Sequence, residues 1–592
     1  MVNRIEKYLD KKHVVIAVIA VLTLLVYCNS FTAPFTLDDF GSIVNNYAIH
    51  NPLDFKAIWE FYSNRFVLYF TLSLNYYLHG TMVAGYHITN VAIHILNGFL
   101  VYLIINNILG LSHFRHKLSG RYRNIVSILS AFIFVCHPVQ VNAVTYIVQR
   151  TASLAAMFYF LAVYLFLRYR LTNKARYFVL MMVSIVLAMF TKENTFTIPF
   201  MLLVIELMFF LNDGKTTWSK RVIVFLIIFA TLPIIPCTNL VLKGYSQSDP
   251  DVSFKASTSM DRFQYFYTQL NVIRLYIRQF FIPDYLNFDY SNDFPMSKTI
   301  WDNYSYISLV ILLVIVLIGL FNIRRNKLVA FGIFWFFIGL SVESSFISIK
   351  DVYFEHRLYL PIVGFIIFLI GFAFTELKRV TRLYLFKKPV LFFIVSSCCM
   401  ICIYSALTLQ RNYIFSDDIR LWTDVVKKAP ASDRAHSVLG TKYLDRYEAD
   451  KEKNKEYLAL AETELKKAIE LNYSNSTART NLSKVYLLKG EYEKCIEEAK
   501  KANRISKSKY AYHNLGLAYK SLGKLDDAID AFIEGYKLDN KCSFILRDLG
   551  YAYYEKKDYE NAKFYFEEYL KLYSYDKENI EEKLKEISQA NR

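Results

Sequence analysis

Long apolar runs separated by short polar connectors fill the chain up to about residue 410. The first run ends at Cys28, and the others cover residues 85–108, 124–137, 152–169, 176–191, 195–212, 221–242, 304–322, 328–346, 357–377 and 389–409. A helix needs roughly 20 mainly apolar residues to cross a bilayer. The pattern therefore predicts an all-α protein that begins with a polytopic membrane helical domain of about 11 spans.

Two further stretches are apolar but do not fit a simple span. Residues 66–78 are too short, which favours an interfacial or re-entrant helix. Residues 263–282 carry Arg274 and Arg278 on an apolar background. This second pattern is typical of an amphipathic helix, and we expect it at the outer membrane surface.

Lys and Arg gather in alternate connectors between the apolar runs. These connectors contain Arg115, Lys117, Arg121 and Arg123; Arg168, Arg170, Lys174 and Arg176; Lys215, Lys220 and Arg221; Arg324, Arg325 and Lys327; and Lys378, Arg379, Arg382, Lys387 and Lys388. Cytoplasmic loops of membrane proteins carry the excess of Lys and Arg, so we expect these connectors in the cytoplasm. An odd number of spans then places the C-terminal part on the other side.

The N-terminus is also basic, with Arg4, Lys7, Lys11 and Lys12 ahead of the first run. A cleavable signal peptide is the alternative interpretation. Bulky Phe31 and the lack of an Ala-x-Ala cleavage site favour a retained anchor with a cytoplasmic N-terminus.

The net charge of +17 comes mainly from these same basic connectors. Residues 431–592 hold 30 Lys and Arg against 29 Asp and Glu, so almost all of the excess belongs to the first 430 residues. Basic residues placed between apolar runs do not form the continuous basic surface of a nucleic-acid-binding protein. We therefore exclude nucleic-acid binding.

Beyond residue 430 the sequence repeats with a period near 34 residues. Residues 514–519 read Asn-Leu-Gly-Leu-Ala-Tyr and residues 548–553 read Asp-Leu-Gly-Tyr-Ala-Tyr, with Gly516 and Gly550 in corresponding places. The pattern resembles the tetratricopeptide repeat and predicts a solenoid of about four helix pairs. Residues 449–455 form a polar insert in the first unit. We divide the chain into a membrane domain (1–410), a linker (411–430) and a repeat domain (431–592).

Such solenoids bind extended peptides or partner proteins on their concave face. A passive dimerisation or spacer role is the alternative, and the sequence predicts no oligomeric state. The eight cysteines show no metal-ligand spacing, so no metal ligand is assigned. Cys398, Cys399 and Cys402 share one apolar run and fit helix packing. Whether Cys495 and Cys542 pair is left open.

Polar residues that suit chemistry gather in the connectors assigned to the non-cytoplasmic side. Asp38 and Asp39 directly follow the first span, and the later connectors carry His137-Pro138, Lys192-Glu193, Glu343 and Glu355-His356-Arg357. Paired carboxylates at a membrane surface are also found as simple solvated caps. The density of functional side chains in the neighbouring connectors favours a surface-facing active site.

The two acidic residues in the first loop resemble the hallmark of GT-C glycosyltransferases. The full order of motifs resembles the transmembrane-and-tetratricopeptide-containing protein O-mannosyltransferases and their bacterial relatives. The motifs are Asp38-Asp39; Gly85-Tyr86-His87, Asn90 and His94; His137-Pro138-Val139-Gln140; Arg150; Lys192-Glu193; Tyr267-Thr268-Gln269; Pro283 with Asn287-Phe288-Asp289-Tyr290; Glu355-His356-Arg357-Leu358-Tyr359-Leu360-Pro361; Arg411-Asn412; and Leu421-Trp422. The likeness covers nearly the whole chain.

The resemblance implies an inverting transferase that moves one sugar, with mannose as the first candidate, from a polyprenyl-phosphate carrier to Ser or Thr hydroxyls of proteins. Asp38 or Asp39 would be the catalytic base. The donor phosphate would be bound by Arg357, with Arg150 and Lys192 as second choices. Glu355 would orient Arg357, and the remaining site-lining residues would be His356, His87, His94, His137 and Glu193. Structural hydrogen bonding is the alternative role for the histidines, and a self-paired interfacial cap is the alternative for Lys192-Glu193.

The predicted donor is a lipid-linked sugar, no cofactor is firmly implied, and the sequence does not settle a need for divalent metal. We expect an integral protein of a bacterial cytoplasmic membrane, with the repeats periplasmic or extracellular (lumenal in a eukaryote) and presenting the acceptor polypeptide. Two alternatives remain: an acceptor that is a surface glycan or lipid, and a non-catalytic scaffold or transporter. A transporter needs charged residues inside the spans, and Glu206 is the clear example here.

Overall fold

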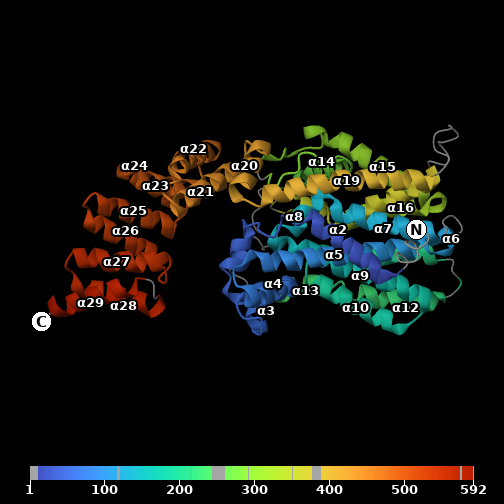
Figure 1. Ribbon diagram of the computed structural model, residues 1–592, viewed down its shortest axis with the longest axis horizontal. Coiled ribbons are helices and arrows are strands. Elements are labelled where there is room, and N and C mark those ends of the chain that lie inside the picture. Colours follow the sequence, from blue (N-terminus) through green and yellow to red (C-terminus); the bar gives the residue numbers. More distant parts are fainter. Residues whose placement is uncertain are drawn as a thin grey trace. The chain divides into compact units, whose positions relative to one another are not determined.

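The computed structural model describes residues 11–115, 120–211, 214, 216–242, 261–290, 293–349, 351–376, 389–573 and 576–590. These residues form helices and loops and contain no β-strand, so the all-α prediction is confirmed for them. Their contacts divide the chain into two compact units (Figure 1). Unit 1 comprises residues 1–288 and 294–421, and unit 2 comprises residues 289–293 and 422–592.

Unit 1 is a bundle of mainly apolar helices. Its larger helices are α2 (Lys12–Val26), α4 (Phe66–His79), α5 (Val83–Leu109), α7 (Gly120–Cys136), α9 (Arg150–Thr172), α10 (Ala175–Met189), α12 (Trp218–Phe229), α14 (Arg262–Phe281), α15 (Ser305–Arg325), α16 (Lys327–Leu340), α17 (Ile362–Gly371) and α19 (Pro389–Phe415). The shorter ones are α3 (Phe55–Tyr62), α6 (Ser112–Arg115), α8 (Val141–Val144), α11 (Ile198–Ile205) and α13 (Ile234–Leu242). Each predicted apolar run contains a helix.

The predicted number of 11 full-length spans is wrong. Among the described residues, six helices are long and apolar enough to cross a membrane: Val83–Leu109, Ile147–Thr172, Glu193–Phe210, Trp218–Thr238, Asp302–Arg325 and Phe393–Phe415. A seventh results if Tyr122–Cys136 and Pro138–Val144, which meet at a 51° bend, form one span. Four other apolar helices have only 10–17 residues. At 1.5 Å per residue they reach about 15–26 Å, less than the roughly 30 Å hydrocarbon layer. Even so, the long apolar helices identify a membrane protein.

The two ambiguous stretches also form helices. Residues 66–78 lie in α4, and residues 263–282 lie in α14. Arg274 and Arg278 are exposed on α14, whereas Gln269 and Gln279 on its other face are buried. The helix is therefore amphipathic in fact as well as in pattern.

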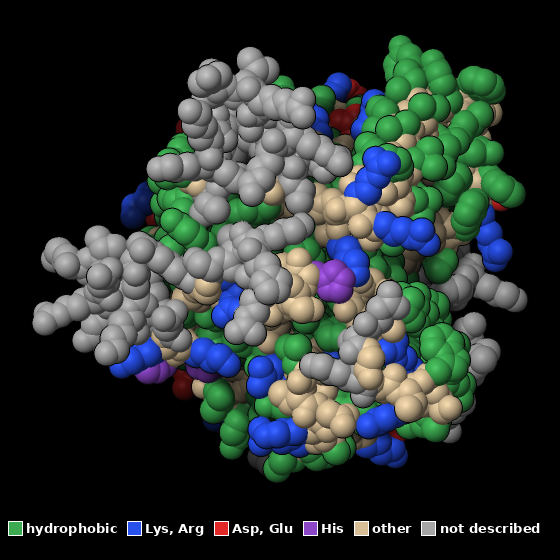
Figure 2. Space-filling model, turned by 90° about the vertical axis from the view of Figure 1, so that its right-hand side faces the viewer, with side chains coloured by type: hydrophobic (Ala, Val, Ile, Leu, Met, Phe, Trp, Pro, Cys, Tyr) green, Lys and Arg blue, Asp and Glu red, His purple; other side chains and the backbone are tan. Residues whose placement is uncertain are grey.

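The basic connectors and the predicted site residues lie at opposite ends of unit 1. The helix α9 begins at Arg150 and carries Arg168 and Arg170 near its other end. Figure 1 places α6 and α12 at this second end and α3, α4 and α8 at the first. Figure 2 looks at the second end, where Lys and Arg side chains are spread over the surface and few acidic ones are seen. Several predicted basic residues lie outside the described residues: Arg4, Lys7, Lys117, Lys215, Lys378, Arg379, Arg382, Lys387 and Lys388, together with the side chains of Arg115 and Arg121.

Unit 2 is built from consecutive helix pairs. In the described part these are α21 (Asp433–Ala449) with α22 (Lys455–Leu471), α23 (Ser476–Lys489) with α24 (Tyr492–Ile505), α25 (Lys509–Ser521) with α26 (Leu525–Leu538), and α27 (Ser543–Glu555) with α28 (Tyr559–Leu572), followed by α29 (Lys577–Ala590). The prediction of about four repeats is confirmed. Of the predicted linker, residues up to Phe415 belong to α19 and Asp418–Lys428 form α20.

Glycines set the spacing of two helix pairs in unit 2, α25 with α26 and α27 with α28. A Cβ added to Gly516 would lie 2.4 Å from the Phe532 ring, and one added to Gly550 would lie 2.5 Å from the Phe566 ring. Real Cβ atoms do not come this close, so only glycine lets these helices approach. Cys495 and Cys542 are buried free thiols in different apolar clusters, and they do not pair.

Candidate active site

Asp39 is built into the loop that follows the first helix. Its carboxylate is fully buried and accepts two backbone hydrogen bonds, from Thr36 N–H at 3.0 Å and from Val148 N–H at 2.8 Å. Burial raises the pKa of Asp39 to about 8, although both backbone hydrogen bonds and the charge of Arg150 act in the opposite direction. Asp39 therefore ties its loop to the short helix η5 (Ile147–Gln149), which directly precedes α9, and does not face solvent.

The side chain of Asp38, in contrast to that of Asp39, is exposed. Its backbone N–H donates to the Tyr146 hydroxyl at 3.1 Å, and the Tyr146 ring packs edge-on against Phe288. The residue before it, Leu37, has a φ of 42°, a left-handed conformation that is uncommon for a non-glycine residue. Strained backbone of this kind is often kept at functional sites. Of the two predicted catalytic carboxylates, only Asp38 can meet a substrate without rearrangement of the loop.

Arg150 is a buried cation held by neutral groups. Its Nε donates to Asn90 Oδ1 at 2.6 Å, one terminal nitrogen donates to the Thr71 carbonyl at 3.1 Å, and the other donates to the Tyr86 carbonyl at 3.3 Å. No carboxylate among the described residues forms an ion pair with it. These bonds join α4, α5 and α9, so in this arrangement Arg150 fixes helices behind the Asp38 loop.

Three of the histidines predicted to line the site donate hydrogen bonds to backbone carbonyls. The Nε2–H of His87 donates to Ala33 O at 2.8 Å, that of His94 donates to Val135 O at 3.1 Å, and that of His137 donates to Phe280 O at 3.0 Å. The Nδ1 atom of His94 accepts from the Tyr359 hydroxyl at 2.7 Å. All three rings are buried, which fits the alternative structural role.

The loop that carries Glu343 and Arg357 rests on the amphipathic helix α14. The Tyr265 hydroxyl donates to the Glu343 carbonyl, and the Tyr276 hydroxyl donates to the Phe354 carbonyl, both at 2.8 Å. The Arg357 guanidinium is buried and donates to the carbonyls of Val352 at 2.8 Å and Asp351 at 2.6 Å. Arg357 thus holds the turn that leads into the short helix η10 (Glu355–Leu358).

Lys192 and Glu193 do not pair with each other. The Lys192 ammonium lies 2.7 Å from Glu343 Oε1, and both side chains are 8% exposed. Glu193 accepts two bonds from the Arg65 guanidinium, each 3.3 Å long. The alternative of a self-paired cap is therefore not seen, because Lys192 pairs with Glu343 and Glu193 pairs with Arg65.

The charges of three cations act on His356. Its burial and the charges of Lys192, Arg357 and Arg65 lower the pKa of His356 well below its usual range. The ring hydrogen-bonds through Nδ1 to Asn142 Oδ1 at 3.1 Å, and α8 packs against η10. We call Arg65, Lys192 and Arg357 the cation cluster. Glu193 pairs with Arg65 and Glu343 pairs with Lys192, and the charge of Asp351 acts on Arg357.

The described ion pair of Glu355 is with Arg411 of α19. Its Oε2 accepts a 2.6 Å bond from Arg411, and both side chains are at most 5% exposed. Arg411 also donates to the Leu286 carbonyl at 2.7 Å. The pair joins η10 to the end of α19, so Glu355 fixes the position of the loop.

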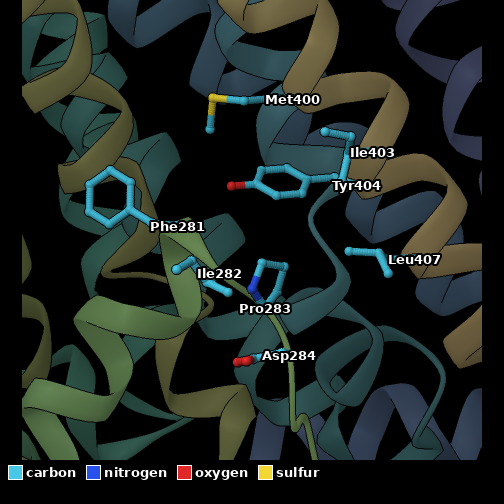
Figure 3. A pocket seen from close by; sticks show the side chains of 8 residues that line it. All are labelled: Phe281, Ile282, Pro283, Asp284, Met400, Ile403, Tyr404 and Leu407. Carbon is cyan, nitrogen blue, oxygen red and sulfur yellow. The ribbon is translucent and has the colours of Figure 1, made fainter.

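An apolar groove of about 380 Å³ lies between the end of α14 and α19 (Figure 3). Phe281, Ile282, Pro283, Met400, Ile403, Tyr404 and Leu407 line it, with Asp284 at one end. The Tyr404 hydroxyl donates to the Phe280 carbonyl at 2.6 Å, the same carbonyl that accepts from His137. The groove therefore adjoins the segment that His137 fixes.

Sequence reasoning missed Arg65 and Tyr146 as site residues. Arg65 directly precedes α4, at the same end of unit 1 as the other site residues. This position was the only feature of the sequence that could have indicated a role for Arg65 in the site. Tyr146 stands among apolar residues and carried no signal. Among the described residues, no group of three or more His, Cys, Asp or Glu side chains is arranged to hold a metal ion.

Several known proteins are similar to this chain. The tetratricopeptide repeat family matches residues 510–542 and 548–576. Protein O-mannosyl-transferase F38B6.6 of Caenorhabditis elegans is 25% identical over 441 residues, which are 71% of this chain and 58% of that protein. Protein O-mannosyl-transferase TMTC4 of Mus musculus is 23% identical over 491 residues, 72% of this chain and 64% of that protein. The chain thus spans about three fifths of the length of these relatives.

Two solved structures resemble a smaller part of the chain. MamA of Desulfovibrio magneticus RS-1 is 19% identical with a TM-score of 0.23, covering 26% of this chain and 82% of that one. PilF of Pseudomonas aeruginosa is 16% identical with a TM-score of 0.25, covering 31% and 84%. Taken over most of its length, the chain is similar in sequence to protein O-mannosyl-transferases, which confirms the resemblance seen in its motifs.

Proposed function

We propose that this protein is a membrane glycosyltransferase that moves one sugar, mannose in the first instance, from a polyprenyl-phosphate donor to Ser or Thr hydroxyls of proteins. One observation carries the proposal: a single segment of the chain contacts both the loop of the exposed residue Asp38 and the cation cluster. Residues 141–148 contact both: Tyr146 and Val148 hold the Asp38-Asp39 loop, and Asn142 bonds His356 within the cation cluster. The printed names of the relatives support the same reaction class.

The chemistry divides between these two parts. The acceptor oxygen attacks C1 of the sugar from the face opposite the phosphate, and its proton passes to the Asp38 carboxylate. The bond between C1 and the phosphate oxygen breaks, and the polyprenyl phosphate leaves with an added negative charge. The cation cluster would stabilise this charge, because guanidinium and ammonium groups bind phosphate oxygens strongly. For this to happen, the phosphate must displace part of the contacts that Glu193 and Glu343 make with Arg65 and Lys192.

The apolar groove beside His137 supports a lipid-linked donor. It offers a wall of apolar side chains for an isoprenoid chain at the same end of unit 1 as the candidate site. The repeats support a polypeptide acceptor, because solenoids of this type bind extended peptides. We further propose that this end of unit 1 and the repeats face away from the cytoplasm, since the opposite end carries the Lys and Arg side chains.

A sugar-transfer assay tests the proposal. It combines purified protein, a radiolabelled polyprenyl-phosphate mannose and a mixture of unfolded acceptor polypeptides, and it measures the label transferred to polypeptide. Wild type should label protein, and Asp38→Asn should not. Glu60→Gln is the matched control, because Glu60 is an exposed acidic residue whose side chain is 49% accessible. Transfer to a glycolipid or glycan alone would favour the alternative acceptor class. Failure of wild type to transfer sugar from any polyprenyl-phosphate donor would refute the proposal and favour a non-catalytic scaffold.

A further inference from the structure

The first helices of successive pairs in unit 2 are joined directly to one another. The helix α21 packs against α23, and α23 packs against α25. The Asn514 amide of α25 donates to the Thr480 carbonyl of α23 at 3.1 Å. Between α25 and α27, His513 Nε2 lies 2.7 Å from Asp548 Oδ2. The helices α21, α23, α25 and α27 therefore form one continuous layer within unit 2.

One side of α25 and α27 in this layer is accessible to a binding partner. Residues three or four positions apart lie on the same side of a helix. Six at least partly exposed residues of this side define what we call the repeat face: Tyr510, His513, Lys520, Phe544, Arg547 and Asp548. Repeat solenoids use extended surfaces of this kind for binding.

Stacked aromatic rings lie at the start of the repeat face. The ring centres of Tyr510 and Phe544 are 5.7 Å apart, with an angle of 28° between the ring planes. The His513 ring lies 4.5 Å from the Phe544 ring. Tyr510 is 54% exposed. Rigid aromatic side chains supply a large contact area at a low entropy cost, and aromatic-lined surfaces bind proline-rich segments. The exposed Tyr510 ring therefore offers a contact for an apolar or proline side chain.

The positive charges of α23, α25 and α27 are balanced by neighbouring carboxylates. These three helices contain six Lys and Arg residues. Each one forms an ion pair: Arg479 with Glu498, Lys484 with Glu448, Lys489 with Glu462, Lys509 with Asp539, Lys520 with Glu555 and Arg547 with Asp548. An acidic ligand would have to compete with these carboxylates for the cations, and a basic ligand would have to compete with the cations for the carboxylates.

We propose that the repeat face binds an extended, uncharged segment of the acceptor polypeptide, with an apolar or proline side chain against the Tyr510 ring. The inference rests on the proposed function, which supplies a polypeptide acceptor. The segment is extended because the face continues from one repeat to the next. It is uncharged because such a segment leaves every ion pair of the face in place, whereas a charged segment gains only what it takes from an existing partner.

Peptide binding to full-length protein in detergent, measured without any sugar donor, tests this inference. A neutral fluorescent peptide contains Ser, Thr, Pro and Val. Two charged versions of the same length keep Ser, Thr and Pro but replace each Val by Asp or by Lys. Fluorescence anisotropy gives the Kd of each peptide. Wild type should bind the neutral peptide roughly tenfold more tightly than either charged one, a difference of about 1.4 kcal/mol.

Two substitutions on the repeat face separate the aromatic contact from the charge balance. Tyr510→Ala removes the exposed ring and should weaken binding of the neutral peptide roughly tenfold, as expected for the loss of an aromatic anchor. Asp548→Asn removes the carboxylate that faces His513 and Arg547. Its affinity for the acidic peptide should rise, while its affinity for the neutral peptide should stay unchanged.

Phe564→Ala is the matched control, because Phe564 is a 49% exposed aromatic residue on the second helix α28. It should bind all three peptides like wild type, and thermal melts of each variant check folding. Equal binding of the three peptides by wild type, or an unchanged Kd in folded Tyr510→Ala, would overturn the inference even if wild type transfers sugar. Selective binding of the neutral peptide without transfer from any polyprenyl-phosphate donor would support the repeat face and refute the proposed function.

Discussion

The different settings of Asp38 and Asp39 lead to opposite expectations for their asparagine variants. Asp39 accepts N–H groups with both carboxylate oxygens. Asparagine can accept only one of them, because its amide nitrogen is itself a donor. A buried N–H left without an acceptor costs about 1–3 kcal/mol, so Asp39→Asn should destabilise the protein by that amount. Asp38 is exposed, so Asp38→Asn should leave stability nearly unchanged and lower the transfer rate by roughly 10²–10⁴.

The assay measures thermal stability in detergent and sugar transfer on the same preparations. Asp54→Asn is a useful control, because Asp54 accepts one backbone N–H at an exposed helix start and the variant should lose little in either measurement. An Asp39→Asn protein as stable as wild type would refute the structural role. If it were stable and inactive while Asp38→Asn stayed active, the two roles would be reversed.

Four further outcomes are expected. Because burial raises the pKa of Asp39 from 3.8 to about 8, its contribution to stability should be complete below about pH 4 and lost as pH rises toward 8; thermal melts of wild type should show this fall, and those of Asp39→Asn should not. Arg357→Lys keeps one charge but loses the planar guanidinium fork, so donor affinity should fall whichever acceptor is used; unchanged donor binding would remove Arg357 from the site. Leu407→Trp should raise the KM for a long-chain donor but not for a short-chain one if the groove holds the isoprenoid chain. Deleting residues 431–592 should impair transfer to full-length proteins more than to a short peptide; equal loss on both would argue against acceptor presentation.

The sequence was sufficient for the helical fold and for the repeats, because both depend on local pattern. Apolar runs gave helices, and Gly516 and Gly550 marked where helix pairs touch. The number of full spans could not be read in this way, since an apolar run continues past the point where its helix ends. The run 328–346, for example, contains α16, which stops at Leu340.

The residues of the candidate site were largely predicted, but their pairing was not. Chain neighbours such as Lys192 and Glu193 point to different segments, and Glu355 bonds Arg411 across 56 positions rather than Arg357. A β-like or irregular loop sends adjacent side chains in different directions, so sequence adjacency says little about contact. Arg65 and Tyr146 were missed because their partners lie far away in the chain. Arg65 pairs with Glu193, and the Tyr146 hydroxyl accepts from the backbone N–H of Asp38.

The position of His356 has a consequence for the pH at which the protein can work. A histidine among ordinary surroundings gains a proton as the medium acidifies, which would strengthen the attraction of its neighbourhood for a phosphate. The burial of His356, together with the charges of Lys192, Arg357 and Arg65, lowers its pKa and so opposes its protonation. If the cation cluster binds the donor phosphate as proposed, its attraction for that phosphate should change little on mild acidification of the compartment that this end of unit 1 faces. Lipid phosphate would then be released as readily in a slightly acidic environment as in a neutral one.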